Sequence, residues 1–184
     1  MNKRILIIGL GYVGTSLMLM FSKQNNVTVS DTNQKKLLKL NNLQLSIEDD
    51  YASAFLRNEN LNISTIEPDE INYNDYEYLI IATPTNYDPK LNFFDTDVVD
   101  FYSKEAIKNN SNIIVVIKST VPVGHTHSLN EVLNTNQVVF SPEFLREGSA
   151  LYDNLYPSRI VVGGDIDIAN KFLELHRASC LKKD

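Results

Sequence analysis

The sequence predicts an α/β fold, in which a doubly wound, mainly parallel sheet carries helices on both faces. Three observations lead to this prediction. Short apolar runs alternate with stretches of helical spacing along the 184 residues. The first run, Arg4–Ile8, is almost unbroken in its apolar character, as in strands that are buried on both faces. Three glycines at the spacing G-x-G-x-x-G follow this run at once, and a helix-like stretch comes next.

The glycine turn has the layout of a dinucleotide-binding βαβ unit of the Rossmann type. Gly9 lets the chain turn sharply out of the strand, and Gly11 lets the backbone approach a pyrophosphate without a Cβ in the way. Gly14 allows the helix to pack closely on the sheet. The free N–H groups at the start of that helix, at the positive end of its dipole, then hold the phosphates.

An acidic residue closes the second strand of this unit. Asp31 lies 20 residues beyond Gly11, where a carboxylate accepts hydrogen bonds from both hydroxyls of the adenosine ribose. The same carboxylate repels a 2′-phosphate, and residues 32–34 include no Arg that would bind one. The sequence therefore favours NAD over NADP, with Lys35 and Lys36 close enough to keep NADP as an alternative.

The elements alternate along the chain, which implies right-handed crossovers between parallel strands. Strands are expected at Arg4–Ile8, Val27–Ser30, Tyr78–Thr83, Ile113–Lys118, Val138–Ser141 and Arg159–Val162. Helices are expected at Tyr12–Lys23, Asn33–Leu40, from a capping box of Ser46 and Asp49 through Arg57, at Asp95–Lys108, and at Ile166–Leu181 behind an Asp165 cap. No linker divides the chain, so residues 1–184 are predicted to form one domain.

Composition and charge narrow the functional classes. Residues of hydrophobic type make up 43% of the chain, which is enough for a packed core. The net charge of −6, without a stripe of Lys and Arg, argues against nucleic acid as a partner. The apolar runs are too short to span a membrane, and the chain enters its first strand without a signal peptide. The single cysteine, Cys180, fits a reducing compartment, so a cytoplasmic protein is expected.

Three loops after strand ends have unusual compositions, and ligands of such sheets bind at that edge. Residues Ala82–Tyr87 and Lys118–Gly124 are rich in small and hydroxylated side chains with proline, which suits loops lying along a cofactor. Residues Ser141–Gly148 carry two carboxylates around an arginine. A simple turn is the alternative interpretation of residues 82–87, and a solvated charged turn is that of residues 141–148, although loops at this edge often carry function.

The histidines do not predict a metal site. His125 and His127 would point to nearly opposite sides of a helix, and no Cys or acidic motif accompanies them. His176 and Cys180 share a helical face, but two ligands do not make a site. The spacing of Cys180 with the apolar residues before it favours a packed thiol.

Together these motifs resemble the UDP-glucose/GDP-mannose dehydrogenase family, and most closely the branch that oxidises UDP-glucose. The pieces that match run in family order along nearly the whole chain: Gly9-Leu-Gly-Tyr-Val-Gly14, Ala82-Thr-Pro-Thr85, Lys118-Ser-Thr-Val-Pro-Val-Gly124, Ser141-Pro-Glu-Phe-Leu-Arg-Glu-Gly148 and Asn154-Leu-Tyr-Pro-Ser-Arg-Ile160.

The resemblance implies roles for individual residues. The implied NAD-binding set, together with the glycine turn and the strand-end loops, is Gly9, Gly11, Tyr12, Val13, Gly14, Asp31, Lys36, Thr83, Pro84, Thr85, Ser119, Thr120 and Glu147. The implied substrate side of the cleft, which receives UDP-glucose or a related nucleotide sugar, is Glu143, Phe144, Leu145, Arg146 and Glu147. In the family, C6 of the sugar is oxidised twice with two NAD, by way of a cysteine thioester. Thr120 and Glu147 would position and deprotonate the water that hydrolyses it.

The chain departs from the family in length and in its cysteine. Family members are roughly twice as long and form homodimers through a central helix, and their catalytic cysteine lies in a later glycine-rich segment. No such segment occurs here, and the surroundings of Cys180 do not match it. The expected function is the NAD-binding half of a UDP-glucose-oxidising enzyme, inactive by itself. The alternatives are the corresponding half for UDP-N-acetylmannosamine or GDP-mannose, and a stand-alone NAD-binding regulatory module.

Overall fold

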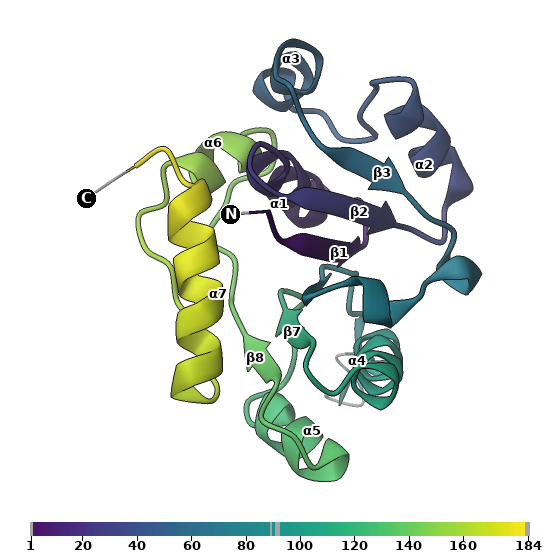
Figure 1. Ribbon diagram of the computed structural model, residues 1–184, viewed down its shortest axis with the longest axis vertical. Helices are drawn as coiled ribbons and strands as arrows, with labels where there is room; N and C mark the ends of the chain where they lie inside the picture. Colours follow the sequence, from purple (N-terminus) through teal and green to yellow (C-terminus); the bar gives the residue numbers. More distant parts are fainter. Residues whose placement is uncertain (1, 89, 91–92, 183–184) are drawn as a thin grey trace.

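The computed structural model describes residues 2–88, 90 and 93–182 and places a six-stranded parallel sheet at the centre of the molecule (Figure 1). The strand order is β3-β2-β1-β4-β7-β8. The strands are β1 (Arg4–Ile8), β2 (Asn26–Ser30), β3 (Ile63–Thr65), β4 (Tyr78–Ile81), β7 (Ile114–Ile117) and β8 (Val138–Phe140). This is the doubly wound arrangement that the alternating pattern predicts, and the fold class is confirmed.

Helices cover both faces of the sheet. Their bounds are α1 (Tyr12–Ser22), α2 (Gln34–Asn41), α3 (Asp50–Asn58), α4 (Asp97–Asn109), α5 (His125–Leu133), α6 (Ala150–Leu155) and α7 (Ile166–Ser179). Alternate residues of β1 point to opposite faces: Ile5 and Ile7 pack with α1, α3, α6 and α7, whereas Leu6 and Ile8 pack with α4 and α5. Two separate apolar cores therefore hold the sheet between two helical layers.

The order of the strands reverses direction between β1 and β4. From β1 the chain moves outward to β2 and β3, and from β4 it moves to the other side through β7 and β8 (Figure 1). The loops that leave the carboxyl ends of β1 and β4 diverge, and this leaves a crevice between them. The fold thus provides a ligand site at the point where the glycine turn follows β1.

Most of the expected elements occur, with small shifts at their ends. The Asp165 side chain caps α7, as the sequence predicts, and Asn33, the first residue of the expected second helix, is the N-cap of α2. The capping box at Ser46 is wrong: α3 begins at Asp50, because the Asp49 carboxylate accepts a hydrogen bond from the Ala52 N–H and is the cap. A carboxylate is a strong N-cap by itself, so the helix begins three residues later.

The expected strand at Arg159–Val162 is also wrong. The segment only approaches β8, where Phe140 and Gly163 form an isolated antiparallel bridge. Ile160 and Val162 pack against the core without joining a strand ladder, so their apolar character reflects burial alone. The structure also contains elements that the sequence did not indicate, namely the short β3, the β5–β6 hairpin (Tyr87–Asp88 and Phe93–Phe94), α5 and α6.

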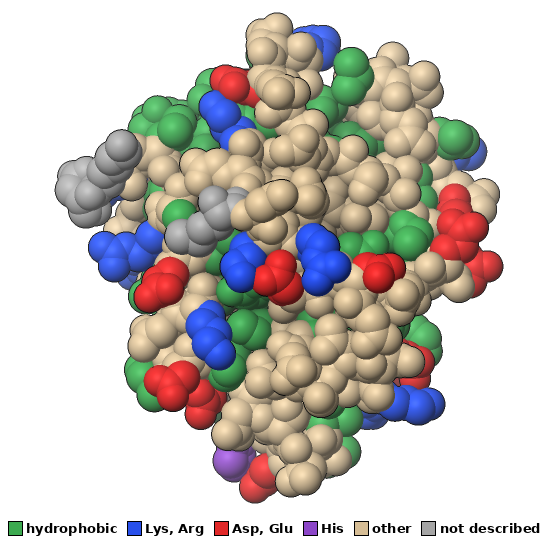
Figure 2. Space-filling view, viewed as in Figure 1, with side chains coloured by type: hydrophobic (Ala, Val, Ile, Leu, Met, Phe, Trp, Pro, Cys, Tyr) green, Lys and Arg blue, Asp and Glu red, His purple; other side chains and the backbone are tan. Residues whose placement is uncertain are grey.

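Charged side chains are mixed on the face seen in Figure 2, where blue and red residues stand side by side and no continuous basic band appears among the described residues. Several are paired, including Lys3 with Glu77 at 2.7 Å and Lys23 with Glu59 at 2.9 Å. Exposed pairs of this kind contribute little to stability. In the part of the chain that the structure describes, no helix combines the length and apolar character needed to cross a membrane.

Candidate functional site

A cavity of about 650 Å³ lies at the carboxyl ends of β1, β4, β7 and β8. Its walls come from the glycine turn, the end of β2 and the three strand-end loops. The lining residues are Gly9, Leu10, Gly11, Tyr12, Val13, Asp31, Lys36, Ala82, Thr83, Pro84, Thr85, Lys118, Ser119, Thr120, Phe140, Pro142, Glu143, Leu145 and Glu147. Segments that lie between Gly9 and Glu147 in the sequence therefore meet at one crevice.

The three glycines serve different needs. Gly9 has a φ of +101°, and a Cβ there would lie 2.5 Å from the Ala82 carbonyl oxygen. At Gly14 a Cβ would come within 1.8 Å of the Gly9 carbonyl oxygen. At Gly11 a Cβ would meet nothing within 4 Å. Packing therefore requires Gly9 and Gly14, whereas only a ligand that enters the cavity would need the space at Gly11.

The start of α1 is open to an anion. Its N-cap, Gly11, has no side chain to bond the first-turn N–H groups, and no acidic residue lies in that turn. Unpaired N–H groups at the positive end of a helix dipole attract phosphate. The uncapped helix start and the empty space at Gly11 together fit the pyrophosphate of a dinucleotide.

Asp31 lies at the same end of the cavity and is anchored by three hydrogen bonds. The Leu10 N–H donates to its Oδ2 at 2.8 Å, the Asn33 N–H donates to its Oδ1 at 2.9 Å, and Lys36 Nζ donates to Oδ2 at 2.9 Å. Burial opposes its ionisation, but the hydrogen bonds from Lys36 and from the two backbone N–H groups outweigh burial and lower the pKa of Asp31. The carboxylate is charged and fixed in place.

The loops after β4 and β7 are joined by side chains of the cavity wall. The Thr85 hydroxyl donates to the Thr120 carbonyl oxygen at 2.7 Å, and the Thr83 and Ser119 hydroxyl oxygens lie 3.4 Å apart. These two contacts bridge 35 and 36 residues of sequence. The hydroxyl-rich composition of both loops therefore holds the middle of the cavity together.

The far end of the cavity contains a buried ion pair. Lys118 Nζ lies 3.1 Å from Glu143 Oε1 and donates to Ser141 Oγ at 3.1 Å. The Lys118 and Glu143 side chains are 2% and 15% exposed. Burial lowers the pKa of Lys118 and raises the pKa of Glu143, and the attraction between the two charges opposes both shifts.

The structure brings most of the residues singled out from the sequence to this cavity. Three of them do not line it. Gly14 packs on Gly9, Phe144 is exposed beneath Arg159, and Arg146 binds Asp153 at 2.8 Å on the surface. Five further lining residues had no individual role in the sequence interpretation, although all but Phe140 lie in the quoted motifs: Leu10, Ala82, Lys118, Phe140 and Pro142. Only Lys118 carried a usable signal, because it is a charged residue that directly follows a buried apolar strand.

Cys180 is a packed thiol away from this cavity. It caps the end of α7 and is 8% exposed, with Sγ 3.5 Å from the Asn154 carbonyl oxygen and 3.4 Å from His176 Nδ1. Burial raises the pKa of the thiol to about 11, so it is a poor nucleophile at neutral pH. Burial, aided by the positive charge of Lys118, lowers the pKa of His176 to about 3.

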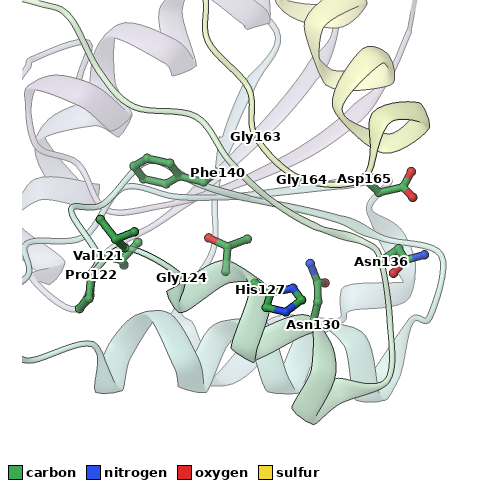
Figure 3. Close-up of a pocket in the computed structure, with 12 residues that line it drawn as sticks. Val121, Pro122, Gly124, His127, Asn130, Asn136, Phe140, Gly163, Gly164 and Asp165 are labelled. Atoms are coloured by element: carbon green, nitrogen blue, oxygen red, sulfur yellow. The ribbon is translucent and has the colours of Figure 1, made fainter.

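A second hollow, of about 590 Å³, lies between α5, β8 and the start of α7 (Figure 3). His127 and Asn130 face it from α5, and Asp165 stands on the opposite wall. His125 leaves the same helix toward α4, where its Nε2 lies 2.9 Å from Asp100 Oδ1. The two histidines thus diverge, and the described residues contain no group of three or more His, Cys, Asp or Glu suited to a metal ion.

The sheet order, the uncapped glycine turn and the acid at the end of β2 define the class of the molecule as a Rossmann-type dinucleotide-binding domain. The model of the UDP-glucose/GDP-mannose dehydrogenase family, NAD binding domain, matches residues 3–177. The chain belongs to this family, and NAD is the cofactor of the domain. The open space at Gly11 and the fixed Asp31 carboxylate fit that cofactor.

Individual relatives agree with this assignment. The chain is 43% identical to the UDP-glucose 6-dehydrogenase of Streptococcus pneumoniae over 188 residues, which cover 98% of this chain and 48% of that protein. It is 43% identical to the Campylobacter jejuni UDP-glucose 6-dehydrogenase over 162 residues, 87% of this chain and 41% of that protein. The chain therefore spans about half the length of the curated relatives it matches.

A solved structure shares the fold at the same partial coverage. A UDP-glucose dehydrogenase from Pyrobaculum islandicum superposes with a TM-score of 0.80 at 26% identity, over 97% of this chain and 44% of that one. A GDP-mannose dehydrogenase from Pseudomonas aeruginosa superposes with the same TM-score at 23% identity, which shows the fold alone.

Proposed function

We propose that this chain, as one domain, is the NAD-binding half of a nucleotide-sugar 6-dehydrogenase that oxidises C6 of UDP-glucose to the carboxylate with two NAD. The single observation that carries the proposal is the cavity itself. One end has the pyrophosphate cradle and Asp31, and the other has hydroxyls and carboxylates on the loops after β7 and β8. NAD, when bound, supplies the hydride acceptor.

The residues of this chain have separable tasks in the proposal. Gly11 and the first turn of α1 bind the pyrophosphate, and Asp31 accepts hydrogen bonds from the adenosine ribose. The loops joined by Thr85 and Thr120 hold the reactive end of the cofactor. Glu143 and Glu147 face the sugar nucleotide, and Thr120 with Glu147 orients a water and accepts its proton during release of the acid.

The nucleophilic thiol of the reaction comes from outside this chain in the proposal. Cys180 lines none of the cofactor cavity, and its raised pKa keeps it protonated. The similarity to UDP-glucose 6-dehydrogenases supports UDP-glucose as the substrate. By the same reasoning, the second half of such an enzyme encloses the sugar and mediates homodimer formation in the cytoplasm.

The test is titration calorimetry with NAD, followed by an assay of NADH absorbance with millimolar UDP-glucose. The chain alone should bind NAD and show no turnover, because proximity to a thiolate and enclosure from water are both missing. Addition of the separately expressed C-terminal half of the Streptococcus pneumoniae relative should restore activity. Activity of the chain alone that disappears in a Cys180→Ser variant would overturn the proposal, as would a chain that does not bind NAD.

A further inference from the structure

The far end of the cavity contains a buried lysine, Lys118, that the binding of NAD does not explain. Lys118 is a 2% exposed cation at the carboxyl end of β7, and nothing in the binding of a dinucleotide requires it there. Desolvation of a buried ammonium is strongly unfavourable and must be offset by an ion pair and hydrogen bonds. A buried lysine at the wall of a ligand cavity is therefore a candidate functional residue.

The hydrogen-bond and ion-pair partners of the Lys118 side chain both lie in the loop that follows β8. Its Nζ donates to Ser141 Oγ and pairs with Glu143 Oε1, both at 3.1 Å. Ser141 is itself fixed, because its backbone N–H donates to the Ile117 carbonyl oxygen at 2.9 Å. The ammonium is thus held by two partners and presents its charge to a single carboxylate.

Glu143 is only partly satisfied by these contacts. Its Oε1 is paired with Lys118, whereas its Oε2 is buried without a hydrogen-bond partner among the described residues. The other charged or titratable groups around the pair do not compensate for this: Asp153 is bound by Arg146, Arg159 stacks on Phe144 at 5.1 Å, and His176 is buried. Lys118 is therefore the one nearby group in the described structure that stabilises a negative charge on Glu143.

We propose that Lys118 is a positioning residue that keeps Glu143 ionised and oriented toward the cofactor cavity. Glu143 lines the cavity and begins the loop that faces the sugar nucleotide, so this inference rests on the proposed function. Without the ammonium, the carboxyl group would take up a proton, could no longer accept a proton from a ligand, and would be a weaker hydrogen-bond acceptor. Lys118 would act through Glu143, with no contact to substrate of its own.

The test is a pH titration of the Glu143 carboxyl carbon by NMR in the ¹³C-glutamate-labelled chain, with Glu143→Gln to assign the signal. In Lys118→Met the titration midpoint should rise by about one to three pH units, the effect of removing an opposite charge at this distance. Lys118→Arg should restore most of the parent midpoint, because it keeps the charge. Ser141→Ala should move the midpoint much less, because it removes a neutral partner of Lys118.

Equal midpoints in the parent and Lys118→Met would overturn the proposal. If circular dichroism shows that Lys118→Met does not fold, the charge states of Glu143 and Lys118 in the parent are the test. Both side chains must be charged at pH 7, and a neutral form of either one overturns the proposal. A parallel NAD titration of the parent keeps the two ideas apart. Loss of NAD binding with an intact Glu143 response would reject the proposed function and leave the role of Lys118 standing.

Discussion

The two ends of the cofactor cavity each hold a carboxylate in a different way. Asp31 is bonded by two backbone N–H groups and by Lys36, and its pKa is lowered. Glu143 has one buried lysine as its partner and a second oxygen without one, and its pKa is raised. The backbone N–H groups are positioned by the turn itself, and they stabilise the charge of a nearby carboxylate. A buried ion pair depends on segments that are distant in sequence, and its attraction offsets only part of the cost of desolvation.

The Asp31 end of the cavity is held by local packing, and the substitution with the largest expected effect on stability tests this. Gly14→Val should lower the free energy of unfolding by about 3 kcal/mol or more and weaken NAD binding, because even the first carbon of the side chain overlaps the Gly9 carbonyl oxygen. Urea denaturation and titration calorimetry measure the two effects. Unchanged stability and affinity would show that α1 does not depend on this close approach.

A second prediction concerns the charge at the Asp31 end. NAD should bind at least about tenfold more tightly than NADP, since the carboxylate would face the 2′-phosphate, and Asp31→Ala should lose about 2 kcal/mol of NAD affinity with its charged hydrogen bonds. Asp31→Asn is the matched control, because it keeps an acceptor and should narrow the gap between the cofactors. Calorimetry that found equal affinities, or an Ala variant as tight as the parent, would contradict the role of Asp31.

His176 of α7, buried beside the Lys118–Glu143 pair and outside the cofactor cavity, should make the free energy of unfolding depend on pH. Its folded pKa of about 3 lies below its ordinary value of 6.5, so the unfolded chain takes up a proton first and stability falls as pH drops through 6.5 toward 3. Between pH 7 and pH 5 the loss from this group should be about 2 kcal/mol. Urea denaturation at pH 7 and at pH 5 should show the free energy of unfolding falling by about 2 kcal/mol more in the parent than in His176→Gln. Equal losses in the two proteins would show that His176 titrates normally.

The smallest effect on stability is expected at Gly11, and it separates packing from ligand binding. Gly11→Ala should leave the free energy of unfolding within about 0.5 kcal/mol of the parent, because a Cβ there meets no neighbour. NAD affinity should nevertheless fall about tenfold, since the methyl group occupies the approach of the pyrophosphate. Thermal unfolding measures the change in stability, and NAD titration of the same sample measures the change in affinity. A variant that binds NAD as well as the parent would place the pyrophosphate elsewhere.

The sequence by itself determined the class of fold and the Asp31 end of the cavity. Buried parallel strands have unbroken apolar runs, and the glycine spacing with Asp31 lies within one continuous βαβ unit. Local signals also placed α2 and α7, whose Asn33 and Asp165 caps are side chains adjacent to the helices they begin. Such features can be predicted from the sequence because the residues that determine them lie within one short segment of the chain.

Only the tertiary structure decided the rest. Arg159–Val162 has the composition of a strand, yet it forms only a bridge at Gly163 beside β8, and a sequence does not reveal which apolar runs find a pairing partner. The pairing of Lys118 with Glu143 could not be predicted for a related reason: Glu143 belongs to a different strand-end loop, 25 positions further along the chain. The pairing exists because β7 and β8 are neighbours in the sheet, and their parallel carboxyl ends bring the two side chains to the same edge.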